Sequence, residues 1–329
     1  MQPTQDLAFK FHYVRNGQNQ GMFARKGSLT TFGLTLNDEL LAFDDILRTY
    51  SAGKRLVLML SQNAQSTLNL PKGVLDEGGI VIETKLDLAQ SIKRRIDQVI
   101  SRRNAELHRQ QLLQEDSEYA FRAVDCAHCG SVIDVSGLER TAYVYCNYCE
   151  HLLDQNGQAI APDGTYTTCP ECSMFDRVKS YTEFYFYFLV FVYGFSYKQR
   201  RVCDRCAQDV FGKTFWLNLP FLLGLPWSIA IKVRSTAGRD AGLQALPKAN
   251  KLARRGRYPE AVPLYAQMNA RYPEHPGLLM NQGIGLLSSS DASGANEYFS
   301  RTLKSCSNYT PVLRLLHQIT AAQQQANNS

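Results

Sequence analysis

Eight of the nine cysteines in this 329-residue chain fall into Cys-x-x-Cys pairs. Two cysteines at this spacing can turn both sulfur atoms toward one metal ion, and two such pairs complete the tetrahedral shell that Zn²⁺ prefers. The sequence therefore predicts two structural Zn²⁺ ions with eight metal ligands. These are Cys126, Cys129, Cys146, Cys149, Cys169, Cys172, Cys203 and Cys206.

Disulfide bonds and a redox-active dithiol are the alternative uses of such pairs. Residues 1–6 carry neither the basic nor the apolar part of a secretory leader, so we expect a cytoplasmic location. Structural disulfides are rare in that reducing compartment. A redox dithiol normally occurs once, within a βαβ pattern, and no such pattern surrounds these pairs. We therefore favour zinc over both alternatives.

The predicted metal sites are structural rather than catalytic. A catalytic zinc keeps one position open for water or substrate, whereas four thiolates fill every position. His128 and His151 lie beside the cysteines, but a complete sulfur shell does not need them. The sequence also lacks a nucleophile elbow, a phosphate-binding loop, a zinc-protease motif and a dinucleotide fingerprint. We expect no catalytic residues and a protein that is not an enzyme.

The spacing of the first four cysteines, Cys-x2-Cys-x16-Cys-x2-Cys, resembles a zinc ribbon. The other two pairs are separated by thirty residues that include an aromatic run at 184–197. We interpret that run as an enlarged hairpin of a second ribbon. Sequential grouping of the pairs predicts two ribbons, whereas alternating grouping predicts one cross-braced module. The sequential grouping is the one we favour.

Short β-like runs and one amphipathic helix must position the N-terminal part of the chain. The helix is predicted from Leu86 to Leu107, where apolar residues follow helical spacing. Met22 and Phe23 are expected to resume the first hairpin after a turn at 16–21. The β-like runs lie at 7–14, 28–32, 34–36, 39–43, 46–50, 55–61 and 79–83.

Three phrases give residues 5–112 a resemblance to pleckstrin-homology-like domains. They are Lys-Gly-Ser-Leu-Thr at 26–30, Asp-Asp-Ile at 44–46 and Gly-Lys-Arg-Leu-Val-Leu at 53–58. The resemblance implies a β-barrel or sheet closed by a C-terminal helix. Some members bind phosphoinositides near the first strand-to-strand loop, and most bind proteins. Four basic residues lie near that place here: Lys10, Arg15, Arg25 and Lys26.

An uncharged apolar run at 215–231 follows the last cysteine pair. Two prolines and a glycine interrupt it, which disfavours one straight membrane-spanning helix. A re-entrant or peripheral hairpin at the inner face of a membrane and burial within the protein are the favoured alternatives, and a true span is the third. In the first, anionic membrane contact would involve Trp216, Trp227, Lys232 and Arg234.

The C-terminal region contains a 34-residue period. Ala249, Leu252, Ala261 and Tyr265 recur as Gly283, Leu286, Ala295 and Phe299. This period, together with Gly256 and Pro273, resembles the tetratricopeptide repeat over residues 242–309, with a capping helix from Pro311 to about Gln323. The resemblance implies binding of protein partners. Two repeats are a small array, so docking against its own neighbours or pairing with a second copy as a homo-oligomer is also expected.

The predicted fold class is multidomain α+β. Its expected parts are a pleckstrin-homology-like domain at 1–115, zinc ribbons at 116–160 and 161–212, an apolar hairpin with a basic linker at 213–241, and helical repeats at 242–329. From Lys198 to Arg257 there are thirteen Lys or Arg residues and three acidic residues, which favours an anionic partner.

These features predict a zinc-stabilised adaptor or scaffold that contacts several partners, with zinc setting the relative geometry of its recognition surfaces. The alternative is a nucleic-acid-binding zinc-ribbon protein. In that case Tyr143, Tyr145 and Tyr148 would stack on bases, and the basic run at 198–201 would contact phosphates.

Overall fold

The computed structural model describes residues 6–115, 120–160, 162, 165–189, 192–218, 225–238 and 240–327. The chain divides into two compact units, Met1–Gly137 and Leu138–Ser329. The fold is mixed α+β, as the sequence predicts, with an antiparallel sheet in the first unit and small cysteine-rich sheets followed by helices in the second.

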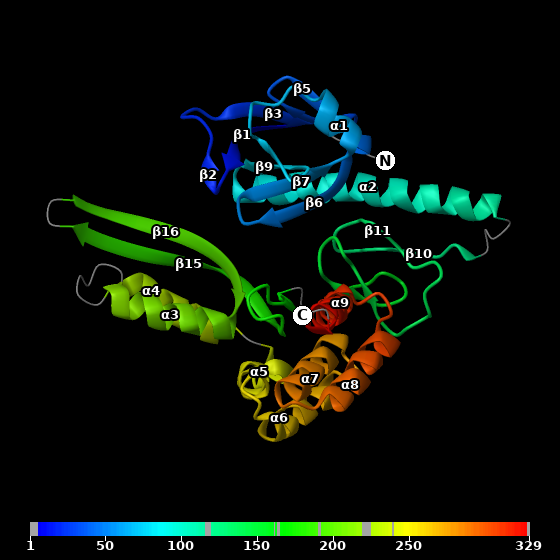
Figure 1. Cartoon of the computed structure of the whole chain (residues 1–329), viewed down its shortest axis with the longest axis vertical. Helices are drawn as coiled ribbons and strands as arrows, with labels where there is room; N and C mark the ends of the chain where they lie inside the picture. The colour runs from blue at the N-terminus through cyan, green and yellow to red at the C-terminus, as the bar shows by residue number, and fades with distance from the viewer. Residues whose placement is uncertain are drawn as a thin grey trace. The chain divides into compact units, whose positions relative to one another are not determined.

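An antiparallel sheet forms the body of the first unit (Figure 1). Its strand order is β5-β4-β3-β1-β9-β7-β6, so β5 and β6 are its two ends and the sheet does not close into a barrel. Strand β1 joins the two halves, because Leu7–Phe11 pair with β3 while His12 and Tyr13 pair with β9. The strands are β1 (Leu7–Arg15), β3 (Arg25–Leu29), β4 (Gly33–Leu36), β5 (Glu39–Ala42), β6 (Ile46–Ala52), β7 (Arg55–Leu60) and β9 (Gly79–Glu83); the short strands β2 (Gln18–Asn19) and β8 (Leu75–Asp76) pair with β1 and β9.

Alternation of buried and exposed positions explains these strands. In β7, Leu56, Leu58 and Leu60 are buried while the intervening side chains are partly exposed. The predicted amphipathic helix is α2 (Leu86–Gln114), and its Ile92 and Ile96 join the core of the sheet. Between β5 and β6 lies the short helix η1 (Phe43–Asp45), and α1 (Gln62–Thr67) follows β7.

The strand predictions around the first hairpin are partly wrong, because Gln18–Asn19 form β2 inside the predicted turn and residues 30–32 lie outside β3. Met22 and Phe23 do not resume a strand; they lie in the bend that leads to β3 and are 88% and 82% exposed. Gly21 has a φ of +83°, and Gln20 N–H donates to the carbonyl of Tyr13 at 2.7 Å. This turn ends the pairing of β1 with β2. The alternating apolar residues at 22 and 23 therefore do not extend the β-ladder. The first unit ends with a hairpin of β10 (Ala123–Asp125) and β11 (Val132–Asp134).

The second unit begins with small sheets. Strands β12 (Val144–Tyr145) and β13 (Leu152–Leu153) form one pair, and β14 (Tyr166–Thr168), β15 (Phe175–Leu189) and β16 (Val192–Cys203) form a three-stranded sheet. The predicted hairpin at 184–197 is confirmed, because β15 and β16 pair along their lengths from Val178↔Cys203 to Leu189↔Val192. Helices α3 (Asp204–Asn218) and α4 (Leu225–Thr236) follow and pack on this hairpin (Figure 1).

Paired helices complete the second unit. They are α5 (Leu246–Arg254), α6 (Tyr258–Arg271), α7 (Pro276–Ser288), α8 (Ala292–Ser305) and the final helix α9 (Thr310–Asn327), preceded by η4 (Ala241–Leu243). The 34-residue period holds at the turn between helices, where Gly256 and Ser290 have φ of +71° and +65°. Serine thus adopts the left-handed conformation that glycine adopts in the preceding repeat.

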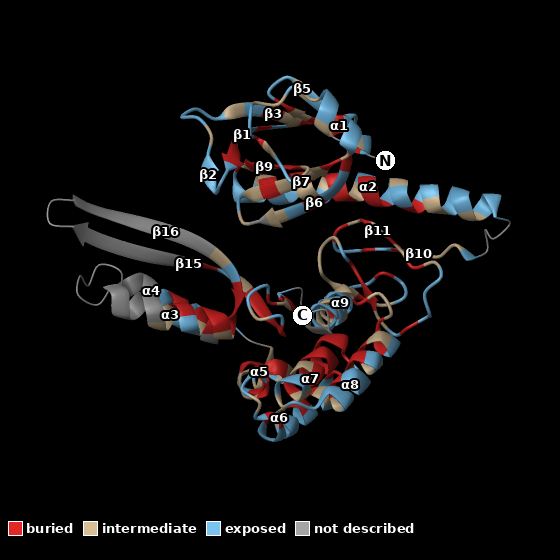
Figure 2. Ribbon diagram, in the orientation of Figure 1, coloured by how far each residue is buried: buried red, intermediate tan, exposed pale blue. Residues whose placement is uncertain are grey.

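Small residues at the repeat positions allow close helix packing. An ideal Cβ on Gly283 would lie 2.4 Å from a ring carbon of Phe299, so only glycine fits beside that ring. Helix α7 is buried along most of its length (Figure 2). Within the described residues, none of the helices combines the length and the apolar character needed to cross a membrane.

Candidate metal centres

The first three cysteine pairs share one backbone geometry, which we call a knuckle. In each, the residue after the second cysteine is left-handed, with φ of +73° at Gly130, +65° at Glu150 and +58° at Ser173. The N–H of that residue donates to the carbonyl of the first cysteine at 2.7 to 2.8 Å. The N–H of the first cysteine donates to the carbonyl five residues later at 2.9 Å in all three. This tight turn brings both thiols of a pair to one side.

The fourth pair is different, because it lies where a strand becomes a helix. Cys203 is the last residue of β16, and Cys206 lies in the first turn of α3. The N–H of Cys206 points to the Cys203 Sγ at 3.4 Å, and the N–H of Cys203 points to the Cys169 Sγ at 3.3 Å. The positive end of a helix dipole stabilises a nearby thiolate. The second set of cysteines therefore differs from a pair of knuckles.

The structure gathers the eight cysteines into two groups. We call Cys126, Cys129, Cys146 and Cys149 the first cluster, and Cys169, Cys172, Cys203 and Cys206 the second cluster. Within each cluster the four Sγ atoms lie within 4.8 Å of one another, and the grouping follows the chain order. Neither His128 nor His151 belongs to a cluster. The observed grouping is the sequential one.

The geometry of the second cluster fits a tetrahedral ion. The Sγ atoms of Cys172 and Cys203 are 3.8 Å apart. A tetrahedron with Zn–S bonds of about 2.3 Å has an edge of about 3.8 Å. The cluster therefore needs no rearrangement of this pair to hold an ion of that size.

The electrostatics of the second cluster also favour a cation. Hydrogen bonds, first of all from Cys172, lower the pKa of Cys169, whereas the hydrogen bond with Cys169 raises the pKa of Cys203. Four thiolates this close together repel one another, so they cannot all ionise alone. A divalent cation removes this conflict, and the donor set is the one that Zn²⁺ takes in closed structural sites.

Helix α2 anchors the knuckle at Cys126 and Cys129. The guanidinium of Arg94 donates to the carbonyls of His128 at 2.5 Å and Cys129 at 3.2 Å, and Gln98 Nε2 donates to the Cys129 carbonyl at 2.6 Å. Two residues of one helix thus hold the turn that carries two thiols. One helix face packs on the sheet, and another side positions a knuckle.

The knuckle at Cys146 and Cys149 is held by the C-terminal helical region. Asn308 pairs with the backbone of Tyr145 in both directions, accepting from its N–H at 2.8 Å and donating to its carbonyl at 2.9 Å. The Tyr145 ring packs edge-on against Tyr309 at 5.2 Å between centroids. Tyr145, which directly precedes this knuckle, therefore belongs to the same packed core as the helices.

A similar clamp holds the chain after the third knuckle. Asn281 of α7 accepts from the N–H of Phe175 at 2.7 Å and donates to its carbonyl at 2.7 Å. Asn250 of α5 donates to the same carbonyl at 3.0 Å and accepts from Asn281 at 2.9 Å. The Phe175 ring lies beside His275, with 4.7 Å between centroids, and against Gly277. The repeat helices thus bind an extended segment of their own chain.

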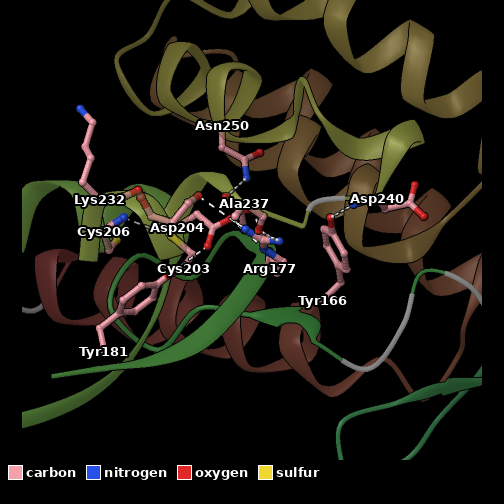
Figure 3. Close-up of polar contacts among 12 residues, drawn as sticks. Tyr166, Arg177, Tyr181, Cys203, Asp204, Cys206, Lys232, Ala237, Asp240 and Asn250 are labelled. Atoms are coloured by element: carbon pink, nitrogen blue, oxygen red, sulfur yellow. Dashed lines mark hydrogen bonds and ion pairs between the residues drawn. The ribbon is translucent and has the colours of Figure 1, made fainter. Parts of the chain in front are cut away.

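A buried ion pair lies beside the second cluster (Figure 3). Arg177 Nε donates to Asp204 Oδ2 at 2.8 Å, and Tyr181 Oη donates to Asp204 Oδ1 at 2.7 Å. Arg177 also donates to the carbonyl of Ala237 at 2.7 Å, just beyond α4. The side chains of Arg177 and Asp204 are 2% and 0% exposed, so each needs the other to offset its buried charge. The pair ties β15 to the start of α3.

Sequence reasoning missed the residues that hold the knuckles. Each of these residues lies far along the chain from the backbone group that it binds. They are Arg94, Gln98, Asn250, Asn281 and Asn308. Single asparagines inside helices carry no periodic signal, so nothing in the sequence marks them. Asp204 was easier to suspect from the sequence, because it lies between two predicted metal ligands, Cys203 and Cys206.

The four basic residues near the first hairpin lie on strands β1 and β3. Arg25 and Lys26 line a hollow of about 580 Å³, together with Met22, Phe23 and neighbouring residues. Lys10 lies directly opposite Lys26 in the β1–β3 ladder, whereas the Arg15 guanidinium lies near Gly73.

Two tyrosines and two arginines that were expected to bind nucleic acid have partners or burial within the second unit. Tyr145 is buried, and Tyr143 donates to the carbonyl of Pro273 at 3.2 Å. Arg200 lies 3.5 Å from Glu171 and Arg201 lies 3.1 Å from Glu150. The side chains of Trp216 and Trp227 lie outside the part of the chain whose side chains the structure describes.

Comparison with known proteins gives no family for this chain. No protein-family model matches it, and no curated protein or solved structure matches it either. The fold and the clusters therefore define it only as a mixed α+β protein with two four-cysteine sites suited to metal ions.

Proposed function

We propose that the protein is a non-enzymatic adaptor in which two structural Zn²⁺ ions stabilise the segments that present its recognition surfaces. The observation that supports this most is the anchoring of each knuckle, directly or through the residue next to it, by hydrogen bonds to a neighbouring helix or helical region. Arg94 of α2, Asn308 before α9 and Asn281 of α7 make these contacts. Folding of a knuckle on its metal then stabilises the neighbouring helices as well.

Two recognition modules follow from this proposal. The first unit is a pleckstrin-homology-like module, supported by a strand shared between two half-sheets and a closing helix. The repeat helices are a tetratricopeptide-like module, supported by the 34-residue recurrence of a left-handed turn. Both modules would bind partner proteins, at the cytoplasmic face of a membrane.

Partner contact in the first unit is best placed on its exposed apolar loops. Phe23 and Phe32 are 82% and 79% exposed, in the loops that precede and follow β3. In the repeats, Phe175 already fills the space beside His275 and Gly277, so partner proteins would use other helix faces. Aromatic side chains are enriched among the residues that contribute most to binding at protein interfaces, which is why we choose these two for the test.

Metal analysis and affinity capture test the proposal together. Purified full-length protein is expected to contain about two zinc ions per chain, since a closed thiolate shell retains its metal. Phe23→Ser combined with Phe32→Ser should lose specific partner proteins from a capture experiment. Leu113→Ser, at a residue 42% exposed near the end of α2, is the matched control. Zinc near zero, or identical captured proteins for both variants, would refute the proposal.

A further inference from the structure

The segment around α3 and α4 has an unusual charge pattern. From residue 210 to residue 239 there is no Asp or Glu, while Lys213, Lys232, Arg234 and Arg239 are all basic. This segment therefore has no acidic residue of its own to neutralise its cations. A surface of this kind attracts anions over a distance of several ångströms.

Helix α4 has one buried side and one exposed side. Ile231 and Ser235 are 4% and 0% exposed, and Ile231 packs in the core formed by the β15–β16 hairpin and α3. Ile229 and Val233 are 54% and 58% exposed and lie one helical turn apart. Two aliphatic side chains thus face outward together on the same helix.

Exposed basic residues flank this aliphatic pair. Lys232 and Arg234 are both exposed, and the helical period places them on opposite sides of the Ile229–Val233 stripe. The Lys232 Nζ lies 5.3 Å from the Phe211 ring centre, and the Arg234 guanidinium carbon lies 5.9 Å from the Tyr181 ring centre. Long basic side chains that lie along apolar groups can still extend their charged ends to an anionic surface.

The dimensions of α4 decide between lying on a bilayer and crossing it. The helix has 12 residues. At about 1.5 Å per residue such a helix is about 18 Å long, shorter than the hydrocarbon core of about 30 Å. An aliphatic stripe between cations is instead the pattern of helices that lie in the headgroup region.

We propose that the exposed face of α4 docks on an anionic lipid surface, with Ile229 and Val233 entering the headgroup region and Lys232 and Arg234 contacting lipid phosphates. This inference rests on the proposed function, which places the protein at the cytoplasmic face of a membrane. It identifies the exposed face of α4 as the surface that contacts the lipid. It is independent of the repeat helices and of the loops at Phe23 and Phe32. We choose an anionic lipid surface because it offers both an apolar layer for the aliphatic stripe and phosphates for the flanking cations. A purely apolar groove on another protein would offer no anionic groups to Lys232 and Arg234.

Vesicle co-sedimentation with full-length, zinc-loaded protein tests the proposal. Vesicles of phosphatidylcholine with about 30% phosphatidylserine should pellet the protein, whereas pure phosphatidylcholine vesicles should pellet little of it. Lys232→Glu with Arg234→Glu should weaken binding at least about tenfold, and Ile229→Asp with Val233→Asp should weaken it to a similar degree. Lys248→Glu with Val262→Asp, at exposed positions of α5 and α6, is the matched control and should bind normally.

Three results would overturn the proposal. They are no pelleting with anionic vesicles, equal pelleting with both kinds of vesicle, and unchanged binding by both α4 variants. Loss of a captured protein partner by the α4 variants, with vesicle binding intact, would assign the face to a protein instead. A normal zinc content in each variant establishes that it has folded. If the vesicle test fails, capture of protein partners through Phe23 and Phe32 can still be observed. The two experiments therefore test the lipid-docking proposal and the adaptor proposal separately.

Discussion

Replacing Asn281 with alanine tests whether the repeat helices hold the extended segment at Phe175. The wild-type amide accepts from the Phe175 N–H and donates to its carbonyl, both at 2.7 Å, and donates to Asn250 at 2.9 Å. Alanine removes all three hydrogen bonds. The Phe175 carbonyl still accepts a hydrogen bond from Asn250, but the Phe175 N–H loses its acceptor, Asn281 Oδ1.

The size of the effect follows from these contacts. Each neutral hydrogen bond contributes about 0.5–1.5 kcal/mol, and a buried N–H left without a partner costs about 1–3 kcal/mol. Phe175 is 2% exposed, so water cannot readily replace the lost hydrogen bonds to its backbone. We expect Asn281→Ala to lower the local free energy of unfolding by about 3–5 kcal/mol. Asn281→Asp, which keeps an acceptor but loses the donor, should also destabilise this segment.

Hydrogen exchange followed by mass spectrometry is the suitable assay, because it reports local opening in a chain with two units. Peptides that cover Phe175 should exchange faster by roughly two to four orders of magnitude in Asn281→Ala. Asn296→Ala, the same chemical change at an exposed position of α8, should change exchange by less than about twofold. Unchanged exchange at Phe175 in Asn281→Ala would refute the clamp.

Three further predictions concern the metal sites and pH. Cys203→Ser should reduce bound zinc from about two ions to about one per chain, because three thiolates do not close the second shell; elemental analysis of the variant would contradict this if it still found two. Arg94→Gln should weaken zinc binding at the first cluster about tenfold or more, measured as faster transfer of zinc to a chromogenic chelator, while Arg102→Gln on the exposed side of the same helix should not. Burial lowers the pKa of His275 from 6.5 to about 3, so the unfolded chain binds a proton that the folded chain does not. Stability present above pH 6.5 is then lost as pH falls toward 3, by about 2 kcal/mol at pH 5. His275→Asn keeps an acceptor for the Gly277 N–H and should flatten this pH dependence; a pH dependence of unfolding equal to that of wild type would exclude His275 as its source.

Local patterns in the sequence predicted a large part of the fold. The alternating runs became the strands of the first sheet, and the helical spacing after Leu86 became α2. The expected capping helix from Pro311 became α9. These predictions succeed because burial of one face imposes a period of two or of 3.6 on neighbouring residues. Met22 and Phe23 were predicted wrongly because a turn at Gly21 interrupts a ladder without interrupting the apolar pattern.

By itself the sequence determined which cysteines can act in pairs, since Cys-x-x-Cys brings two thiols together through local backbone geometry alone. It also determined the 34-residue helical period, because small residues must recur where helices touch. Only the tertiary structure decided which pairs share a cluster, that Cys206 lies in a helix, and which side chains hold the knuckles. Asn281 and Phe175 are 106 residues apart, and a contact across that distance depends on the folded path of the whole unit. A single polar residue in a helix has no repeating partner along the chain, so its role exists only once the elements have packed.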